Sequence, residues 1–96
     1  MTAYAIANVH KIKDQEMYQE YAKLAGPNIT QFQGKLVILG KEIDVLEGSW
    51  DGNQLVIFEF PSRSALDRWY QSDEYAPLLK MRKDSMIADI IVIDND

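Results

Sequence analysis

Hydrophobic and polar residues alternate near the start of the chain, in the pattern of a strand with two different faces. The stretch from Ala3 to His10 places small apolar residues on one side and Tyr4, Ile6, Asn8 and His10 on the other. Runs rich in apolar and β-branched residues predict further strands at 36–39, 45–50, 55–60 and 86–93. The runs at 36–39 and 45–50 fit either one long strand with a bulge or two short strands. The pair Asp51-Gly52 indicates a hairpin turn that leads into the strand at 55–60.

Spacings of three and four between apolar residues predict helices in two regions. The first runs over 17–25 and can be capped by Asp14. Gly26-Pro27 then indicates a kink or a second short helix, which ends at Gly34. In the second region, Ser62 and Ser72 are placed to cap two successive helical segments, at 65–70 and 75–82.

The elements follow the order strand, helix, strand, strand, helix, strand, which is the split βαβ arrangement. We therefore predict an α+β fold, ferredoxin-like βαββαβ with an antiparallel four-stranded sheet. Helices would cover only one face of this sheet, and a solvated second face would show alternating apolar and polar residues. The strands at 55–60 and 86–93 are instead apolar at both alternating positions. A second copy of the chain is the simplest cover for that face, so we predict a homodimer.

Length and composition limit the class of protein. With 96 residues, the chain is long enough for one domain spanning 1–96 and too short for two. A net charge of −5 argues against a nucleic-acid partner, because such binding rests largely on clustered Lys and Arg. The absence of cysteine excludes disulfides and thiolate nucleophiles. We recognise no signal-like start and no apolar stretch of membrane-spanning length, so we expect a cytoplasmic protein without a membrane partner.

Two residues are candidates for acid–base catalysis. His10 is the single histidine, the residue type that titrates most naturally near neutral pH. The alternative for His10 is a solvent-exposed ring near a strand end. Glu59 lies within an apolar strand, where burial would disfavour its ionised form and allow it to act as acid or base. The alternative is exposure at the sheet edge or an ion pair with a basic residue of the later helices: Arg68, Lys80 or Arg82.

Aromatic residues and an arginine are candidates for a substrate-binding site. Trp69 and Tyr70 are expected to cluster with other tyrosines, Tyr18 among them, and aromatics with polar tips suit a pocket for a flat organic molecule. Packing in the core is the alternative for these side chains. Asn8 would give such a pocket a polar end. Arg82 is able to hold a substrate carboxylate with two hydrogen bonds, or it pairs with a carboxylate of the chain and leaves KMRK (80–83) as a solvated face.

Several phrases of the sequence, taken as a set, carry a family resemblance. They are EYAKLAGPNI (20–29), QGK (33–35), VLEGSW (45–50) and FEFPSRSALDRWYQSDEY (58–75), followed by Arg82. The set resembles a small bacterial family with a domain of unknown function (family 1330), which is part of the dimeric α/β-barrel superfamily. The resemblance implies a protomer whose sheet packs against a twofold mate to close a barrel. The superfamily includes cofactor-free monooxygenases, muconolactone isomerase and haem proteins similar to chlorite dismutase, so the fold does not settle the function.

The leading hypothesis is a homodimer that binds or converts a small apolar or aromatic molecule by acid–base chemistry. A single histidine with scattered carboxylates has no recognisable metal-ligand spacing, so no metal is expected. The hypothesis includes no organic cofactor. His10 or Glu59 would move a proton, Asn8 or Tyr70 would donate a hydrogen bond to the developing oxyanion, and Trp69 would shape the pocket. The alternatives are a non-catalytic binding or assembly module with a filled barrel, and a haem protein with His10 as axial ligand.

Overall fold

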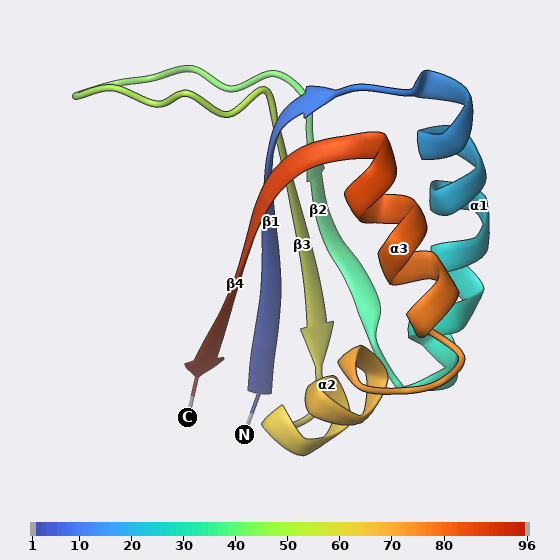
Figure 1. The fold of residues 1–96 in the computed structure, drawn as a ribbon. Coiled ribbons are helices and arrows are strands. Elements are labelled where there is room, and N and C mark those ends of the chain that lie inside the picture. Colours follow the sequence, from blue (N-terminus) through green and yellow to red (C-terminus); the bar gives the residue numbers. More distant parts are fainter. Residues whose placement is uncertain (1, 96) are drawn as a thin grey trace.

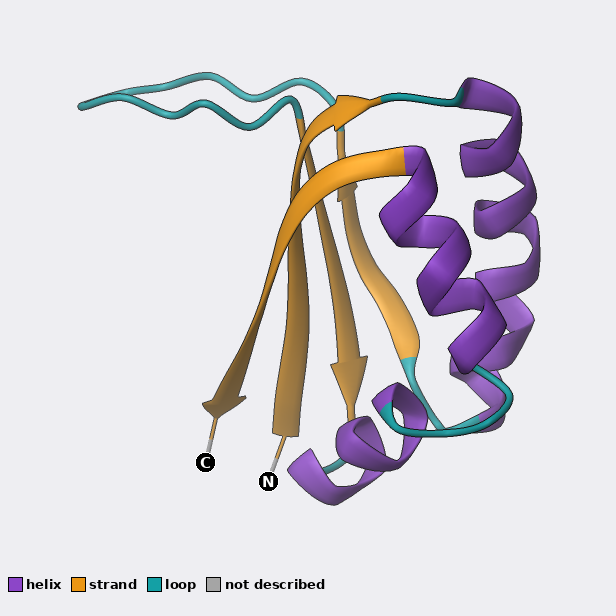
Figure 2. Cartoon of the chain, viewed as in Figure 1, coloured by secondary structure: helices purple, strands orange, loops and turns teal. Residues whose placement is uncertain are grey.

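A computed structural model describes residues 2–95 of the protein (Figures 1 and 2). Its elements are β1 (Thr2–Ile12), α1 (Gln15–Gln31), β2 (Lys35–Gly40), β3 (Gln54–Phe60), α2 (Arg63–Tyr70), α3 (Ala76–Ser85) and β4 (Met86–Asn95). The order confirms the predicted βαββαβ arrangement, with the second helical region divided into α2 and α3. The strands form an antiparallel sheet in the order β2-β3-β1-β4. The helices all lie on one face of this sheet (Figure 1).

Asp14 and Ser62 cap the starts of α1 and α2 as predicted. The carboxylate of Asp14 accepts a hydrogen bond from the Met17 amide (3.0 Å), and the Ser62 hydroxyl accepts one from the Ala65 amide (3.1 Å). Each bond satisfies one of the amides that a helix start leaves without a partner. Ser72 does not cap α3 itself: its hydroxyl accepts from the Tyr75 amide (3.0 Å) in the preceding turn, and Tyr75, the N-cap residue of α3, makes no side-chain capping bond. Helix α1 is continuous through Pro27, so no second short helix forms.

Helix α1 ends in a Schellman motif that brings the chain back to the sheet. The Gly34 amide donates to the Ile29 carbonyl (3.0 Å), and the Gln33 amide donates to the Thr30 carbonyl (2.9 Å). Gln33 takes the left-handed conformation that glycine usually supplies at this position, with a φ of 70°. Gly34 follows one residue later, and a Cβ there would lie 2.6 Å from the ring of Phe60. Gly34 is therefore required by close packing and not by its backbone angle.

The core lies between the helices and one face of the sheet. Small side chains of β1, among them Ala3 and Ala5, are buried beneath α2, and Phe60 from β3 is fully buried. The ring of Trp69 lies 4.4 Å from that of Tyr75 and 5.3 Å from that of Phe60, measured between centroids. Burial of aromatic side chains of this size is a major source of stability in a small domain.

The connection between β2 and β3 differs from the sequence prediction. The run at 45–50 is not a strand, and Asp51-Gly52 is not a tight hairpin turn, because residues 41–53 form a long irregular arm. The arm extends from the end of the sheet toward the side opposite the helices (Figures 1 and 2). It carries exposed apolar side chains, with Leu46 95% and Trp50 49% exposed. Within residues 2–95, this segment has no neighbouring strand to pair with, so its apolar pattern does not produce sheet.

The sheet face opposite the helices carries an apolar row across all four strands. Cross-strand pairing aligns Ile38 with Ile57, Ile57 with Ile6, and Ile6 with Ile91. Ile38 and Ile91 are 44% and 53% exposed. We call this surface the free face. Its apolar character agrees with the two-sided apolar pattern of the strands. The helices leave this face uncovered, and the arm packs only over its Asn8 end.

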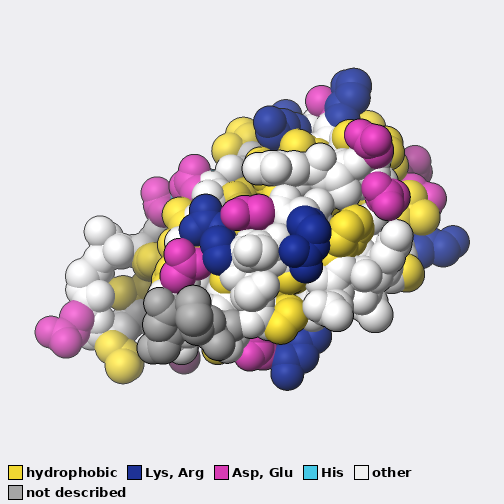
Figure 3. All heavy atoms as spheres, turned by 90° about the horizontal axis from the view of Figure 1, so that it is seen from below, with side chains coloured by type: hydrophobic (Ala, Val, Ile, Leu, Met, Phe, Trp, Pro, Cys, Tyr) yellow, Lys and Arg dark blue, Asp and Glu magenta, His cyan; other side chains and the backbone are white. Residues whose placement is uncertain are grey.

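The side of the molecule seen from below is mixed in charge. Seen from below, Lys and Arg side chains are interspersed with Asp and Glu (Figure 3). Such mixing gives no basic patch on this face of the kind that nucleic-acid binding requires. Among the helices of residues 2–95, none combines the length and the apolar character needed to cross a membrane.

Candidate functional site

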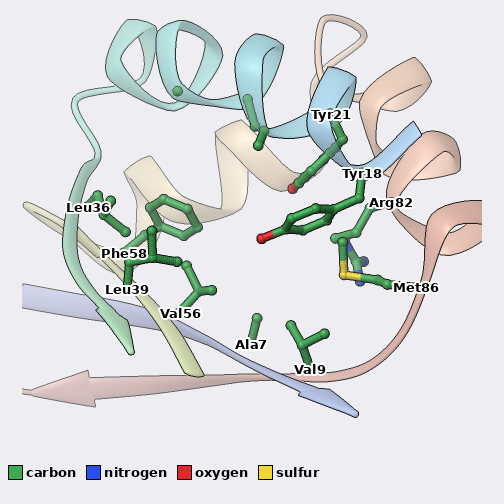
Figure 4. A pocket seen from close by; sticks show the side chains of 13 residues that line it. Ala7, Val9, Tyr18, Tyr21, Leu36, Leu39, Val56, Phe58, Arg82 and Met86 are labelled. Carbon is green, nitrogen blue, oxygen red and sulfur yellow. The ribbon is translucent and has the colours of Figure 1, made fainter. Parts of the chain in front are cut away.

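A cavity of about 240 Å³ lies between α1, the start of β4 and the helix-covered face of the sheet (Figure 4). Its wall is almost entirely apolar, and it opens along β2, where Leu36 and Leu39 are 53% and 50% exposed. The residues that line it come from every element except α2: Ala7, Val9, Tyr18, Tyr21, Ala22, Ala25, Gly26, Leu36, Leu39, Val56, Phe58, Arg82 and Met86. A concave, apolar site with few polar groups is the usual form of a small-molecule pocket.

Small residues line the cavity on both its sheet side and its helix side. Ala7 lies on the sheet side, while Ala22, Ala25 and Gly26 lie on the α1 side. A large side chain at any of these positions would extend into the space, since interiors are otherwise closely packed. The small apolar face of β1 was visible in the sequence, but the glycine and alanines of α1 that oppose it were not identified as site residues.

The polar groups near the cavity are mostly hydroxyls. The Tyr18 hydroxyl accepts a hydrogen bond from Gln54 Nε2 (2.9 Å), and the Tyr21 hydroxyl lies 2.9 Å from that of Tyr75. Burial first, and then the neighbouring Tyr75, raises the pKa of Tyr21 well above its usual range, although the charge of Arg82 acts in the opposite direction. Tyr21 is therefore protonated near neutral pH and can donate a hydrogen bond.

Arg82 is the charged residue of the cavity wall. It lies on α3 and is only 7% exposed. It lines the cavity together with Tyr18 and Met86 (Figure 4). The prediction that 80–83 forms a solvated face is therefore wrong at Arg82, whereas Lys80 and Lys83 are exposed.

The other predicted aromatic binders lie next to this cavity. Trp69 is 4% exposed, and its indole nitrogen donates to Asn28 Oδ1 (3.0 Å), so it belongs to the core. Tyr70 is 38% exposed and stands 6.0 Å from the ring of Tyr75. Both side chains border a smaller hollow of about 30 Å³, which Arg82 also lines. The structure thus brings Tyr18 and Arg82 together at the cavity and places Trp69 and Tyr70 behind them.

His10 lies on the free face, on the opposite side of the sheet from the cavity. Its Nε2 donates to Asp89 Oδ2 (2.8 Å), and its Nδ1 faces the Asp51 carbonyl (3.4 Å). Both neighbours are hydrogen-bond acceptors, so both ring nitrogens can donate only when the ring is protonated. The bond to Asp89, followed by that to Asp51, raises the pKa of His10 above its usual value.

This arrangement predicts a measurable coupling between His10 and Asp89. We expect Asp89→Asn to lower the pKa of His10 toward its usual value, while Asp94→Asn, the same change farther along β4, leaves it unaltered. Because the folded-state pKa is raised, the stabilisation is complete below pH about 6.5 and is lost as the pH rises through the folded-state pKa. An NMR titration of the His10 ring measures both variants. An unchanged His10 pKa in Asp89→Asn would contradict this account.

Glu59 also lies on the free face. Its carboxylate forms an ion pair with Lys35 (3.3 Å), the residue directly across from it on β2. The expected partners on the later helices were wrong, because those helices cover the other side of the sheet. Within one chain, neither His10 nor Glu59 lines the cavity.

Asn8 shares the free face and has an unusual environment. Its Oδ1 is enclosed and has no hydrogen-bond partner among residues 2–95. The atom lies against Gly52 of the arm, where an added Cβ would be 1.7 Å away. The arm therefore packs over Asn8, which stands apart from the cavity.

The described residues offer no evident metal site. Within 2–95, no group of three or more His, Asp or Glu side chains is placed to hold a metal ion. As the axial ligand of a haem, His10 would have to give up its hydrogen bond to Asp89 or that to Asp51.

The antiparallel sheet, its helical layer and its bare second face define the class: a ferredoxin-like α+β protein, of the fold shared by dimeric α/β-barrel proteins. The chain belongs to the family of the Domain of unknown function (DUF1330), whose model matches residues 2–96. This confirms the family resemblance of the sequence. The comparison with curated proteins gave no match.

Solved structures share the fold at low sequence identity. The RPA0582 protein of unknown function from Rhodopseudomonas palustris is 20% identical, with a TM-score of 0.79 over 99% of this chain and 82% of that one. A dimeric ferredoxin-like protein of unknown function from Jannaschia sp. CCS1 is 12% identical, with a TM-score of 0.77 over 99% of this chain and 100% of that one. SnoaB, a cofactor-independent oxygenase from Streptomyces nogalater, is 12% identical, with a TM-score of 0.63 over 99% of this chain and 91% of that one. At these identities the similarity concerns the fold alone.

Proposed function

We propose that the protein is a homodimer that binds a small, mainly apolar organic molecule in the cavity beneath α1. The observation that carries this proposal is the cavity itself, with its apolar wall and its opening along β2. Its volume of about 240 Å³ exceeds that of the ~150 Å³ apolar cavities that accommodate benzene. A one-ring or two-ring compound is therefore of suitable size.

The free face and the arm support the homodimer. The isoleucine row would leave a large apolar surface in water, which monomeric proteins rarely do. The arm extends beyond the same side of the sheet and carries Leu46 and Trp50, both exposed (Figure 1). A second copy placed on the free face would cover the row and receive the arm. The Jannaschia protein, which has the same fold, is described as dimeric.

Binding is supported more strongly than conversion. The cavity wall contains no carboxylate and no imidazole, and Tyr21 is protonated near neutral pH. Conversion by cofactor-free acid–base chemistry is the narrower hypothesis, with His10 and Glu59 as its proton-transfer groups. Those two residues would serve only a ligand bound at the free face. The fold is compatible with such chemistry, since SnoaB is a cofactor-independent oxygenase.

A non-catalytic assembly module is the rival function. That function predicts a filled interior and no room for a ligand. The open cavity and the small residues that create it favour a binding protein over this rival.

A cavity-filling variant tests the proposal. Ala7→Leu places three additional carbons where β1 faces the cavity, so we expect at least a tenfold loss of affinity for an aromatic probe such as 2-naphthoate. Isothermal titration calorimetry measures the dissociation constants. Ala76→Leu on the exposed start of α3 is the matched control, since it adds the same atoms away from the cavity.

The outcomes separate clearly. Loss of binding in Ala7→Leu with retained binding in Ala76→Leu supports the cavity as the site. Equal affinities of wild type and both variants would show that the probe binds elsewhere and would overturn the proposed site. Circular dichroism spectra of the three proteins verify that each is folded.

A further inference from the structure

We infer that the ligand of the cavity carries a carboxylate group, which binds to the guanidinium of Arg82. This inference rests on the proposed function and specifies its substrate class. Arg82 borders both the main cavity and the 30 Å³ hollow behind it, and 93% of its surface is covered by the protein. A permanently charged side chain is thus held at the end of an otherwise apolar space.

The guanidinium has no partner within the part of the chain that the structure describes. Across residues 2–95, the ion pairs involve His10, Lys35, Arg63 and Lys80, and no side chain forms a hydrogen bond with the Arg82 nitrogens. Within residues 2–95, Asn8 Oδ1 is the single side-chain nitrogen or oxygen that is both fully enclosed and without a hydrogen-bond partner. The Arg82 nitrogens, which have no partner either, are therefore not fully enclosed. The Arg82 donors therefore remain accessible from the cavity.

A buried charge without a partner is energetically unfavourable, because the protein interior replaces its hydration poorly. Proteins keep such a group where an incoming ligand supplies the opposite charge. Arginine presents parallel N–H donors that match the two oxygens of a carboxylate. Since the cavity wall holds a single basic side chain, it suits a monoanion better than a phosphate dianion.

The surroundings of Arg82 fit a carboxylate attached to an apolar body. The small hollow, about the size of one water molecule, is lined by Arg82 and by Tyr21 and Tyr75, whose hydroxyls lie 2.9 Å apart. One carboxylate oxygen would fit this hollow. The main cavity, lined by Val56, Phe58 and Leu39, would receive the apolar body (Figure 4).

A pair of isosteric probes tests the inference. 2-Naphthoate and 2-naphthamide have nearly the same shape, but only the first is an anion. We expect wild-type protein to bind the acid about 10- to 100-fold more tightly than the amide, as a charge-assisted hydrogen bond implies. Arg82→Met should remove this preference, Arg82→Lys should retain part of it, and Arg68→Met, at an exposed arginine of α2, should leave it unchanged.

The results distinguish this inference from the proposed function. If wild type binds acid and amide equally and Ala7→Leu weakens both, the cavity is the site and the carboxylate inference is wrong. If Arg82→Met retains the preference for the acid, Arg82 is not its cause and the inference is likewise wrong. If neither probe binds at millimolar concentration, both the inference and the proposed aromatic site fail.

Thermal stability provides a second test. A ligand-binding role and a structural role of Arg82 predict opposite changes in the Tm of the unliganded Arg82→Met variant. Because Arg82→Met removes an unpaired buried charge, we expect its Tm without ligand to rise by about 5 °C or more. Addition of 2-naphthoate should raise the Tm of wild type but not that of Arg82→Met. A lower Tm for the unliganded variant would show that Arg82 stabilises the fold through a partner, which would overturn the inference.

Discussion

Ile91→Glu is expected to separate the proposed homodimer into folded single chains, with a dissociation constant raised more than ~100-fold. Ile91 lies at the β4 end of the isoleucine row and is 53% exposed in the single chain. A glutamate there is readily solvated in the protomer, so the protomer should remain folded. In a twofold interface the substitution occurs twice, and each carboxylate would be buried without a partner.

The size of this effect follows from desolvation. Burial of an unpaired carboxylate costs several kcal/mol, and about 3 kcal/mol corresponds to roughly 100-fold in affinity. Sedimentation velocity over a range of protein concentrations measures the dissociation constant directly.

Leu24→Glu is the matched control for the interface. Leu24 is 41% exposed on α1, on the helical side of the molecule, and does not line the cavity. The same substitution there should leave the dimer intact. If Ile91→Glu associates with the same dissociation constant as the wild type, the free face is not the interface.

Gly34→Ala is expected to destabilise the fold by about 2–4 kcal/mol. The added Cβ would lie 2.5 Å from Ile29 Cγ2 and 2.6 Å from Phe60 Cε1, and both side chains are buried. Phe60 cannot move away, because it is fully buried and packs against Trp69. Urea unfolding at fixed protein concentration measures the change in the free energy of unfolding.

Gly26→Ala provides the contrast. Gly26 lies within α1, and an added Cβ there meets no atom within 4 Å. Because alanine has a higher helix propensity, this substitution should stabilise the fold by up to about 1 kcal/mol. A lower free energy of unfolding for Gly34→Ala and a higher one for Gly26→Ala would support the role of close packing at Gly34. An unchanged free energy of unfolding in Gly34→Ala would contradict it.

The local elements could be predicted because their causes are local. Asp14 and Ser62 cap helices through bonds that span three residues, and the alternation in β1 already separated the face of Ala7 from that of His10. The end of α1 was also foreseen at Gly34, although the left-handed residue is Gln33. Patterns of this kind report short-range geometry.

The arm shows where such patterns mislead. The residues at 45–50 look like a strand because they are apolar, yet no strand within residues 2–95 pairs with them. Apolar patterning reports burial, and it does so equally when the covering surface belongs to another chain. The apolar run at 45–50 was therefore interpreted as a strand, although it lies in the irregular arm.

The cavity could not be read from the sequence, because it depends on which distant residues meet. Ala7 of β1 and Gly26 of α1 come to line the same cavity only after α1 packs on the sheet. Arg82 was one candidate for binding a carboxylate, with an ion pair within the chain as the alternative, but its burial and its lack of a partner within residues 2–95 are properties of the tertiary structure. Likewise, the partners of His10 on β4 and the arm arise from strand pairing and from the path of the arm.

Native mass spectrometry with added 2-naphthoate tests the central claim most directly, because it reads the number of chains and the bound mass together. The account predicts a two-chain species that carries up to one probe per chain, with the probe lost in Ala7→Leu while the two-chain species remains. Single chains without bound probe, from protein shown to be folded, would contradict it.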